Sequence, residues 1–255
     1  MDWNGKVGNL WPFETSDECP SIDILKVNLN KINLSWQLLT EISKMLRRTV
    51  TLRSISPKAR ISPTVVLEGP IVVEPGVTIY DYAKIVGPAF ISRGAIIGNH
   101  SLVRESFLGE GCVVGYLVDI ARSILGNSCW LSQSHIADSI LGNNVNLGGG
   151  TILTSLRLDN RPIQISYGKK IVNTNLLKFG ALVGSKTQIG ANVITMPGVI
   201  IGCDCIICPD VLVDHNLEDN TFCKIKQSIV IRRNTESYSS ETHFKFKKDL
   251  MKDED

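Results

Sequence analysis

Large aliphatic side chains recur every six residues between Ile61 and Ile97, and a smaller or β-branched residue follows each of them four positions later. The large residues are Ile61, Leu67, Val73, Ile79, Ile85, Ile91 and Ile97. The smaller ones are Val65, Ile71, Val77, Ala83, Ala89, Ala95 and Ser101. The spacing returns at Val183, Ile189, Thr195, Ile201, Ile207 and Val213. An amphipathic helix needs apolar spacings of three and four and a half-buried strand needs two, so this period predicts short strands stacked into a solenoid.

Each six-residue unit is expected to form one side of a prism. Three sides complete a coil of roughly 18 residues, which rises by the strand spacing of about 4.8 Å. The large residue fills the interior and the small one fits near the corner. Glycine and asparagine tolerate positive φ, and they recur where corners are due, as at Gly76, Gly94 and Gly142-Asn143. We therefore predict an all-β solenoid of hexapeptide repeats.

The pattern divides the chain into three segments. Residues 1–58 lack the repeat, and residues 21–48 have mostly helical apolar spacings, which predict one or two helices packed on the open end of the solenoid. Residues 59–222 form the solenoid, interrupted near 155–180 by a polar stretch that we expect to protrude as a loop or hairpin. Residues 223–255 are predicted to be an exit strand, within an alternating stretch at 221–232, followed by a mobile tail.

Composition narrows the class of partner and the compartment. The 255 residues are 43% hydrophobic with a formal net charge of +2, which gives no reason to expect nucleic acid or a membrane as a partner. No apolar run approaches the roughly 20 residues of a membrane span, and the polar start lacks signal-peptide character. Seven cysteines, an odd number, predict reduced thiols rather than a disulfide framework. We therefore expect a cytoplasmic protein.

Three stretches resemble one family. Asp138–Asp159 (DSILGNNVNLGGGTILTSLRLD), Lys178–Ser185 and Thr195–Gly202 are similar to the C-terminal left-handed parallel β-helix of bacterial and archaeal bifunctional enzymes. Those enzymes are sugar-1-phosphate nucleotidyltransferases and amino-sugar-phosphate acetyltransferases. Pro20–Asn28 is similar to the helix that joins their two domains, so the resemblance covers roughly residues 20 to 232. It implies left-handed winding and a homotrimer with its sites between subunits.

The nucleotide-binding half of that family has no counterpart in this sequence. A glycine-rich loop that would cradle nucleotide phosphates is missing, so nucleotidyl transfer by this chain unaided is not expected. The resemblance instead implies transfer of an acyl group from acetyl-CoA or another acyl-CoA. The acceptor would be an amino-sugar phosphate or a nucleotide sugar. A separate nucleotidyltransferase chain is a further candidate partner.

The acetyltransferase motif of the family is altered here. It reads His-x-x-Tyr-x-Gly-Asp, with histidine as general base, whereas this chain has Ser132-Gln-Ser-His135-Ile-Ala-Asp138. Ser132 occupies the histidine position and His135 the tyrosine position. A serine alone is no base, so His135 is the candidate for a displaced base. It can equally be a solvated or interface histidine.

The resemblance also implies binding residues. Candidates for the substrate and its phosphate are Arg104, Ser155, Arg157, Asp159 and Lys178. Ser185 falls where the family contacts coenzyme A, and Cys208 is placed in the same cofactor site. An arginine at position 104, where the family has lysine, can grip a phosphate through two N–H groups.

Several of these residues have simpler explanations. Arg157 and Asp159 can pair with each other across a trimer interface, and the exposed aromatics Trp130 and Tyr116 favour an interface over base binding. Cys203, Cys205 and Cys208 face alternately inward and outward, so no metal site is predicted.

Two functions remain open at this stage. One is a stand-alone acyltransferase that uses His135, the phosphate-binding cations and Ser185. The other is a non-catalytic trimer that binds a sugar nucleotide or scaffolds a separate nucleotidyltransferase. Retained cations with a lost base favour binding, whereas the retained late coils favour transfer.

Overall fold

The computed structural model describes residues 37–167, 170–235, 241, 244–245 and 247–248. The chain divides into two compact units, Met1–Ile225 and Lys226–Asp255. The part of the predicted helical segment before residue 37 lies outside the described residues.

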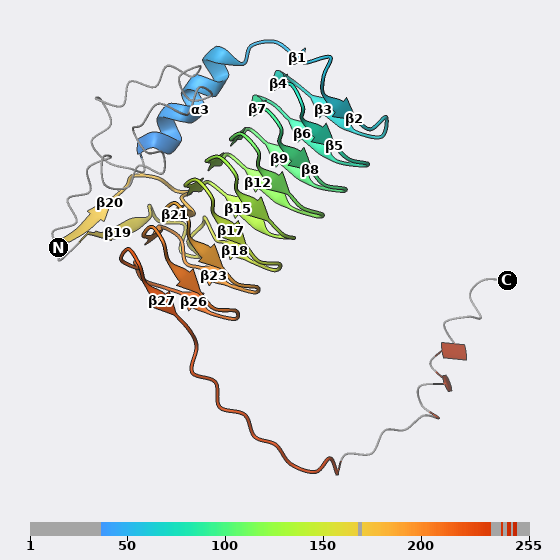
Figure 1. Ribbon diagram of the computed structural model, residues 1–255. Helices are drawn as coiled ribbons and strands as arrows, with labels where there is room; N and C mark the ends of the chain where they lie inside the picture. Colours follow the sequence, from blue (N-terminus) through green and yellow to red (C-terminus); the bar gives the residue numbers. More distant parts are fainter. Residues whose placement is uncertain (1–36, 168–169, 236–240, 242–243, 246, 249–255) are drawn as a thin grey trace. The chain divides into compact units, whose positions relative to one another are not determined.

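Three parallel sheets form the sides of the solenoid (Figure 1). Sheet A contains β1 (Ser54–Ile55), β4 (Ile71–Val73), β7 (Ala89–Ile91), β10 (Phe107–Leu108), β13 (Ile124–Leu125), β16 (Ile140–Leu141), β21 (Ala181–Val183) and β24 (Val199–Ile201). Sheet B contains β2 (Arg60–Ile61), β5 (Thr78–Ile79), β8 (Ile96–Ile97), β11 (Val113–Val114), β14 (Trp130–Leu131), β17 (Asn146–Leu147), β22 (Gln188–Ile189), β25 (Ile206–Ile207) and β27 (Phe222–Cys223). Sheet C contains β3 (Val66–Glu68), β6 (Lys84–Val86), β9 (Leu102–Arg104), β12 (Asp119–Ala121), β15 (His135–Ala137), β18 (Ile152–Leu153), β23 (Ile194–Thr195) and β26 (Leu212–Val213). The predicted all-β solenoid of hexapeptide repeats is confirmed.

The core is made of the residues that carry the repeat. The large aliphatic residues from Val73 to Ile97 are at most 2% exposed, and the small residues Ala83, Ala89 and Ala95 are fully buried. Burying one such aliphatic side chain contributes about 1.5–3 kcal/mol. Stability is therefore spread along the whole stack rather than concentrated in one region.

The six-residue period is lost after Val103 because several sides of the solenoid are one residue shorter. Inward-facing residues stand five apart at four places: Val103 and Leu108, Ile120 and Leu125, Leu131 and Ile136, and Ile136 and Leu141. The strand register stays in step, pairing Val103 with Ile120 and Ile120 with Ile136. The shortened sides thus change the sequence spacing without breaking the sheets.

A column of serines closes the corners between sheets C and A, where three of these short sides lie. Ser123 donates from its hydroxyl to the carbonyl of Ala121 at 2.8 Å, and its backbone N–H donates to the hydroxyl of Ser106 at 3.0 Å. Ser139 repeats the arrangement one coil later, with its N–H donating to the Ser123 hydroxyl at 3.1 Å. These hydroxyls satisfy buried backbone groups that the strands do not reach.

Helix α3 (Gln37–Thr49) runs beside these corners (Figure 1). Leu46 is 2% exposed, and Arg47 pairs with Glu105 at the corner between β9 and β10. The sequence predicted packing on the open end of the solenoid, and for α3 this is wrong. The helix lies along the flank, while Ile55 and Val66 of the first coil remain 40% and 46% exposed.

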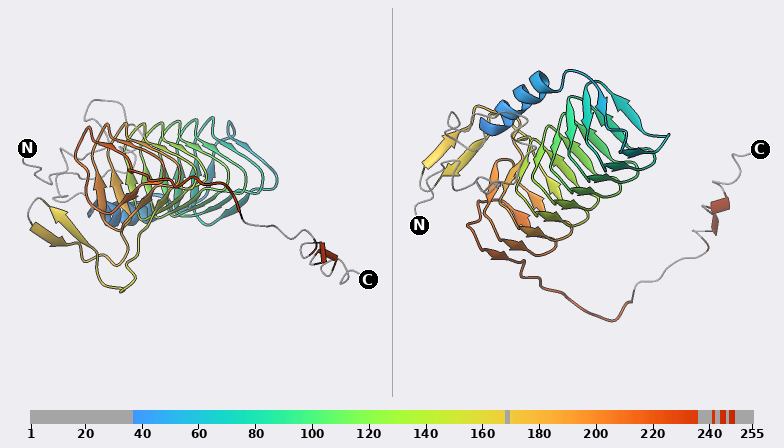
Figure 2. Two further views of the ribbon diagram at one scale, coloured as in Figure 1. Left: turned by 90° about the horizontal axis from the view of Figure 1, so that it is seen from below. Right: turned by 45° about the horizontal axis from the view of Figure 1, so that its top comes forward.

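The interruption near 155–180 leaves the stack between β18 and β21. It contains an antiparallel hairpin, β19 (Gln164–Tyr167) with β20 (Lys170–Asn173), which stands outside the coils (Figure 2). Ile163 and Ile165 at its base are buried. A Cβ on Gly198 would stand 2.6 Å from Cγ2 of Ile163 and 3.6 Å from Cγ1 of Ile165, so the hairpin base packs directly on the solenoid backbone.

The predicted exit strand differs from the structure. Phe222 and Cys223 form β27, which pairs with β25 inside sheet B and therefore belongs to the solenoid. No strand follows between residues 224 and 235. Ile229, Val230 and Ile231 are 68–90% exposed, so the alternation of side chains there has no sheet to bury it. None of the helices in the described part of the chain combines the length and apolar character that crossing a membrane requires.

Candidate functional site

Arg104, Asp119 and His135 meet on the outward face of sheet C. The register pairs Asp119 of β12 with His135 of β15 and places Arg104 of β9 beside Ala121. Asp119 accepts two hydrogen bonds from Nη2 of Arg104, at 2.8 and 3.0 Å. Its Oδ2 lies 3.2 Å from Nδ1 of His135. We call these three residues the sheet C triad.

Asp119 is held as a carboxylate between two donors. Partial burial raises its pKa, but the hydrogen bonds from His135 and Arg104 and their positive charge outweigh burial and lower the pKa below its usual range. An ionised Asp119 accepts a hydrogen bond from Nδ1–H of His135, and in the neutral imidazole this tautomer leaves Nε2 as the acceptor nitrogen. The side chain of His135 is 44% exposed, so Nε2 can be reached from outside.

In the triad, His135 contacts a carboxylate, that of Asp119, which lies outside the altered sequence motif. Ser132, the other residue proposed for catalysis, is half-buried on the short side that precedes β15, and its N–H donates to the carbonyl of Leu147 at 3.0 Å. Sequence reasoning missed Asp119. The sequence feature that could have identified it is the shortened coil of this region. With a coil of 16 residues, Asp119 occupies in the preceding coil the position that His135 occupies in its own.

Of the residues proposed to bind the substrate and its phosphate, Arg104 belongs to the triad and the other four do not. Arg157 donates to Asp159 at 2.8 and 2.6 Å within the segment after β18, and this pair lowers the pKa of the Asp159 carboxyl and raises that of Arg157. Ser155, in the same segment, accepts the N–H of Phe179 at its carbonyl. In sheet C, β18, which leads into this segment, is separated from β9 and Arg104 by β15 and β12. Arg104 and Arg157 are each already paired with a carboxylate.

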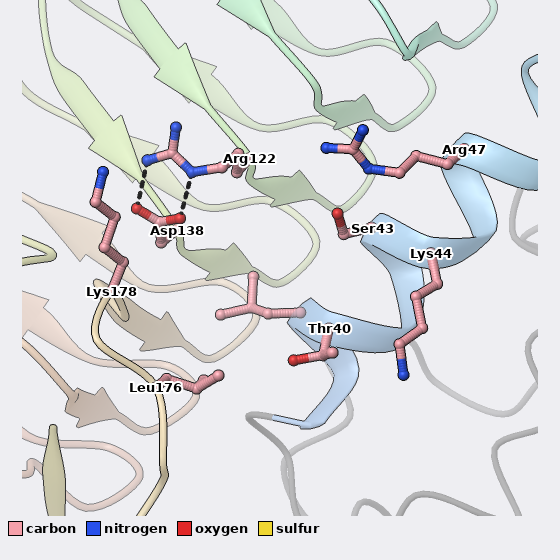
Figure 3. Close-up of a pocket in the computed structure, with 9 residues that line it drawn as sticks. Thr40, Ser43, Lys44, Arg47, Arg122, Asp138, Leu176 and Lys178 are labelled. Carbon is pink, nitrogen blue, oxygen red and sulfur yellow. Dashed lines mark hydrogen bonds and ion pairs between the residues drawn. The ribbon is translucent and has the colours of Figure 1, made fainter. Parts of the chain in front are cut away.

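Lys178 lies in a different place, a cavity of about 270 Å³ between α3 and the solenoid corners (Figure 3). Its helix side includes Thr40, Ser43 and Arg47, and its solenoid side includes Arg122, Asp138 and Lys178. We call it the corner pocket. None of the sheet C triad lines it.

The two residues proposed to bind coenzyme A are also separated. Ser185 lies at the corner that follows β21, and its hydroxyl accepts the N–H of Asn143 at 3.0 Å. Cys208 lies at the corner that follows β25, where its N–H donates to the carbonyl of Cys223. The first corner joins sheets A and B, and the second joins sheets B and C. A single chain therefore does not bring the two side chains together.

The outward faces of the three sheets differ in exposure. On sheet A, Phe90 and Phe107 are buried and stack with ring centroids 5.5 Å apart. Sheets B and C instead present large apolar residues to the outside. Those more than a third exposed are Ile96, Trp130, Ile206 and Phe222 on sheet B, and Val66, Ile152, Ile194 and Leu212 on sheet C.

Comparison with known proteins identifies relatives. No family model matches the chain. It is 35% identical over 221 residues to the bifunctional protein GlmU of Methanococcus aeolicus, a match that takes in 80% of this chain and 49% of that protein. The bifunctional sugar-1-phosphate nucleotidylyltransferase/acetyltransferase of Sulfurisphaera tokodaii is 32% identical over 92 residues, which are 36% of this chain and 23% of that protein.

Among solved structures, the polySia specific acetyltransferase NeuO is 17% identical, with a TM-score of 0.35 over 77% of this chain and 99% of that one. The chain spans about half the length of the M. aeolicus protein and a smaller share of the S. tokodaii protein. Over four fifths of its length, this chain is a relative of the bifunctional sugar-1-phosphate nucleotidyltransferase/acetyltransferases.

Proposed function

We propose that this protein is an acyltransferase that moves an acetyl or other acyl group from acyl-CoA to the amine of an amino-sugar phosphate or nucleotide sugar. The observation that carries the proposal is the contact between Nδ1 of His135 and Asp119, which leaves Nε2 of an exposed histidine as a proton acceptor. The names of the relatives, which include acetyltransferase, support the same reaction class.

His135 does the chemical work of a general base. As the amine nitrogen attacks the acyl carbon, Nε2 takes the proton that the nitrogen must lose, and the proton later leaves with the departing thiol. Asp119 fixes the tautomer and stabilises the imidazolium that forms, and Arg104 positions Asp119. Ser132, three residues before His135 in the chain, is the other residue that we propose for the catalytic site. Acyl-CoA, when bound, supplies the activated thioester carbonyl.

The donor and acceptor sites need more than one subunit. Ser185 and Cys208 stand at different corners, so a coenzyme A site that uses both must lie between neighbouring subunits. Ser155, Arg157, Asp159 and Lys178 remain proposed substrate contacts, of which Arg157 must exchange its bond to Asp159 for one to the substrate.

A homotrimer is the assembly we propose. Sheet A has a covered outward face, whereas sheets B and C carry exposed apolar residues such as Trp130, Ile194 and Phe222. Two different faces on each subunit are what a closed ring requires, because each subunit contacts its two neighbours through unlike surfaces.

The second candidate is a non-catalytic trimer that binds a sugar nucleotide or scaffolds a separate nucleotidyltransferase chain. It is favoured by the loss of histidine at Ser132 and by the pairing of Arg104 and Arg157 with carboxylates, which limits their use on a substrate. For either function we propose a cytoplasmic location. The described cysteines are all free thiols, which fits a reducing compartment.

The deciding experiment is a coenzyme A release assay with acetyl-CoA and a panel of amino-sugar 1-phosphates and their nucleotide derivatives. Wild type is compared with His135→Ala and with the matched control His215→Ala, since His215 also contacts a carboxylate, Asp214, at 2.7 Å but is far more exposed. Turnover lost only in His135→Ala supports the transferase. Absence of turnover together with absence of acetyl-CoA binding by calorimetry supports the binding or scaffold role.

A further inference from the structure

Trp130 is the largest apolar side chain that sheet B presents to the outside. It lies on β14 and is 59% exposed, while its neighbours in the sheet, Val113 of β11 and Asn146 of β17, are half-buried. Leu131, the next residue, points inward and is fully buried. The indole therefore projects outward from this face of the solenoid.

Trp130 belongs to the same coil as His135. β14 directly precedes β15 in the chain, and the two strands lie on either side of the edge between sheets B and C. Trp130 is three residues before Gln133, the turn residue of that edge with a φ of 21°, and His135 is two residues after it. Both residues therefore lie at the same height along the solenoid, and their distances from the edge differ by about one residue, roughly 3.3 Å.

A ring of three subunits brings these two residues together across the interface. The exposed apolar residues extend along both faces, from Ile96 to Phe222 on sheet B and from Val66 to Leu212 on sheet C. Faces of this length cover each other only when the solenoids lie side by side, with the symmetry axis parallel to their length. Rotation about such an axis keeps every coil at its height, so sheet B of one subunit meets sheet C of the next subunit coil by coil.

The sheet C triad is open on the side that faces the neighbouring subunit. The side chains of Asp119 and His135 are 34% and 44% exposed. An indole placed over the imidazole would exclude water from Nε2 of His135, and its flat apolar face is a surface on which a sugar ring packs. The bulk that sheet B offers at this height thus fits what the triad lacks within one chain.

We propose that Trp130 of the partner subunit completes the acceptor site at the sheet C triad, where its ring packs against the sugar ring of the acceptor and holds the amine beside Nε2 of His135. This inference rests on the acyltransferase and the trimer proposed above. It assigns Trp130 a substrate-binding role in addition to packing between subunits, and it makes the site incomplete in a single chain.

Steady-state kinetics with the best acceptor of the coenzyme A release assay test the role of the ring. Trp130→Ala should lower kcat/KM for the acceptor about tenfold or more, and Trp130→Phe, which keeps a flat ring, should retain most of it. The KM for acetyl-CoA should stay within about twofold of wild type. Ile206→Ala is the matched control, since Ile206 is an exposed apolar residue of the same face three strands further along sheet B. Light scattering verifies that each variant keeps the mass of the wild type. Equal loss in Trp130→Ala and Ile206→Ala would overturn the proposal.

Mixed trimers test whether Trp130 acts on the site of its neighbour. Trp130→Ala and His135→Ala chains with different affinity tags are coexpressed, and trimers that contain both are isolated by using the two tags in turn. Each such ring has one interface at which an intact His135 meets an intact Trp130, so coenzyme A release should reach about one third of wild type. Activity no higher than that of the two variants alone would contradict the intersubunit role.

Cross-linking tests the placement of Trp130 without relying on turnover. A short bismaleimide should join the double variant Trp130→Cys/His135→Cys into dimers and trimers more strongly than either single variant or the matched control Ile206→Cys/His135→Cys. Cross-links together with an inactive wild type would overturn the acyltransferase but support the placement. An active wild type with no excess of cross-links in the double variant would overturn the placement.

Discussion

Asp119 and His135 occupy the same position of two neighbouring coils, with Oδ2 of one 3.2 Å from Nδ1 of the other. Adjacent strands of a parallel sheet hold such a pair at fixed spacing, so the carboxylate orients the imidazole without help from a flexible loop. The sheet thus supplies a directed histidine at a position where the family motif has tyrosine.

The first prediction concerns this orientation. Asp119→Asn keeps the shape of the side chain but removes its charge, so the imidazolium formed during catalysis loses its stabilising partner. We expect kcat for coenzyme A release to fall by about 10²–10⁴-fold, the range that a positioned acid or base contributes. The control is Asp214→Asn, which alters the His215 contact instead. A kcat within about twofold of wild type would show that Asp119 has no role in orienting the base.

The second prediction is a pH dependence of stability. The pKa of Asp119 is lowered in the folded protein, so its contribution to stability is present above the unfolded value of about 3.9 and is lost as the pH falls through the folded pKa. The Tm difference between wild type and Asp119→Asn should be largest near neutral pH and should disappear in acid. A difference that grows toward low pH would contradict this account.

The third prediction contrasts two glycines in the same region of the solenoid. A Cβ on Gly180 would stand 2.1 Å from Oγ of Ser139 and 2.3 Å from the carbonyl oxygen of Ala137, whereas a Cβ on Gly149 meets nothing within 4 Å. Gly180→Ala should therefore destabilise the fold by about 1–3 kcal/mol or more, and Gly149→Ala should be close to neutral. Thermal unfolding measures both. Similar Tm values for the two variants would mean that the corner yields to the extra atom.

The fourth prediction concerns assembly. Light scattering on the purified chain should give three times the 28.0 kDa of one subunit. Ile194→Glu places a charge on the exposed face of sheet C and should shift the protein toward monomers, because a buried charge without a partner is costly. Leu52→Glu, at a residue that is 77% exposed and outside the three sheets, should leave the mass unchanged. A wild-type monomer at micromolar concentration would remove the proposed intersubunit sites.

The solenoid could be predicted from the sequence because every coil needs large aliphatic residues that point inward, and these recur at a regular spacing. The placement of α3 could not, since an amphipathic helix shows that it has an apolar face but not which surface of the solenoid receives it. Only part of the sheet C triad could be predicted from the sequence. His135 stood out through the altered motif, but Asp119 becomes its neighbour only when the coil is counted as 16 residues rather than 18.

The environments of the residues proposed to bind a phosphate could be predicted even less well from the sequence. Arg104, Arg157 and Lys178 were grouped by resemblance, yet each has a different environment in the fold. Pairing with Asp119 or Asp159 depends on geometry that residue identity does not reveal. Arg122, which borders the corner pocket, carried no signal in the sequence at all.

The corners between sheets C and A are where this solenoid tolerates changes in chain length. Three successive sides there are one residue short, and the next one holds the entire insertion with its hairpin, while the strands on either side keep their register. Natural length variation and deliberate grafting are both safest at such a place. A foreign peptide exchanged for part of the hairpin of β19 and β20 would be displayed outside the coils and would leave the inward-facing repeat unchanged.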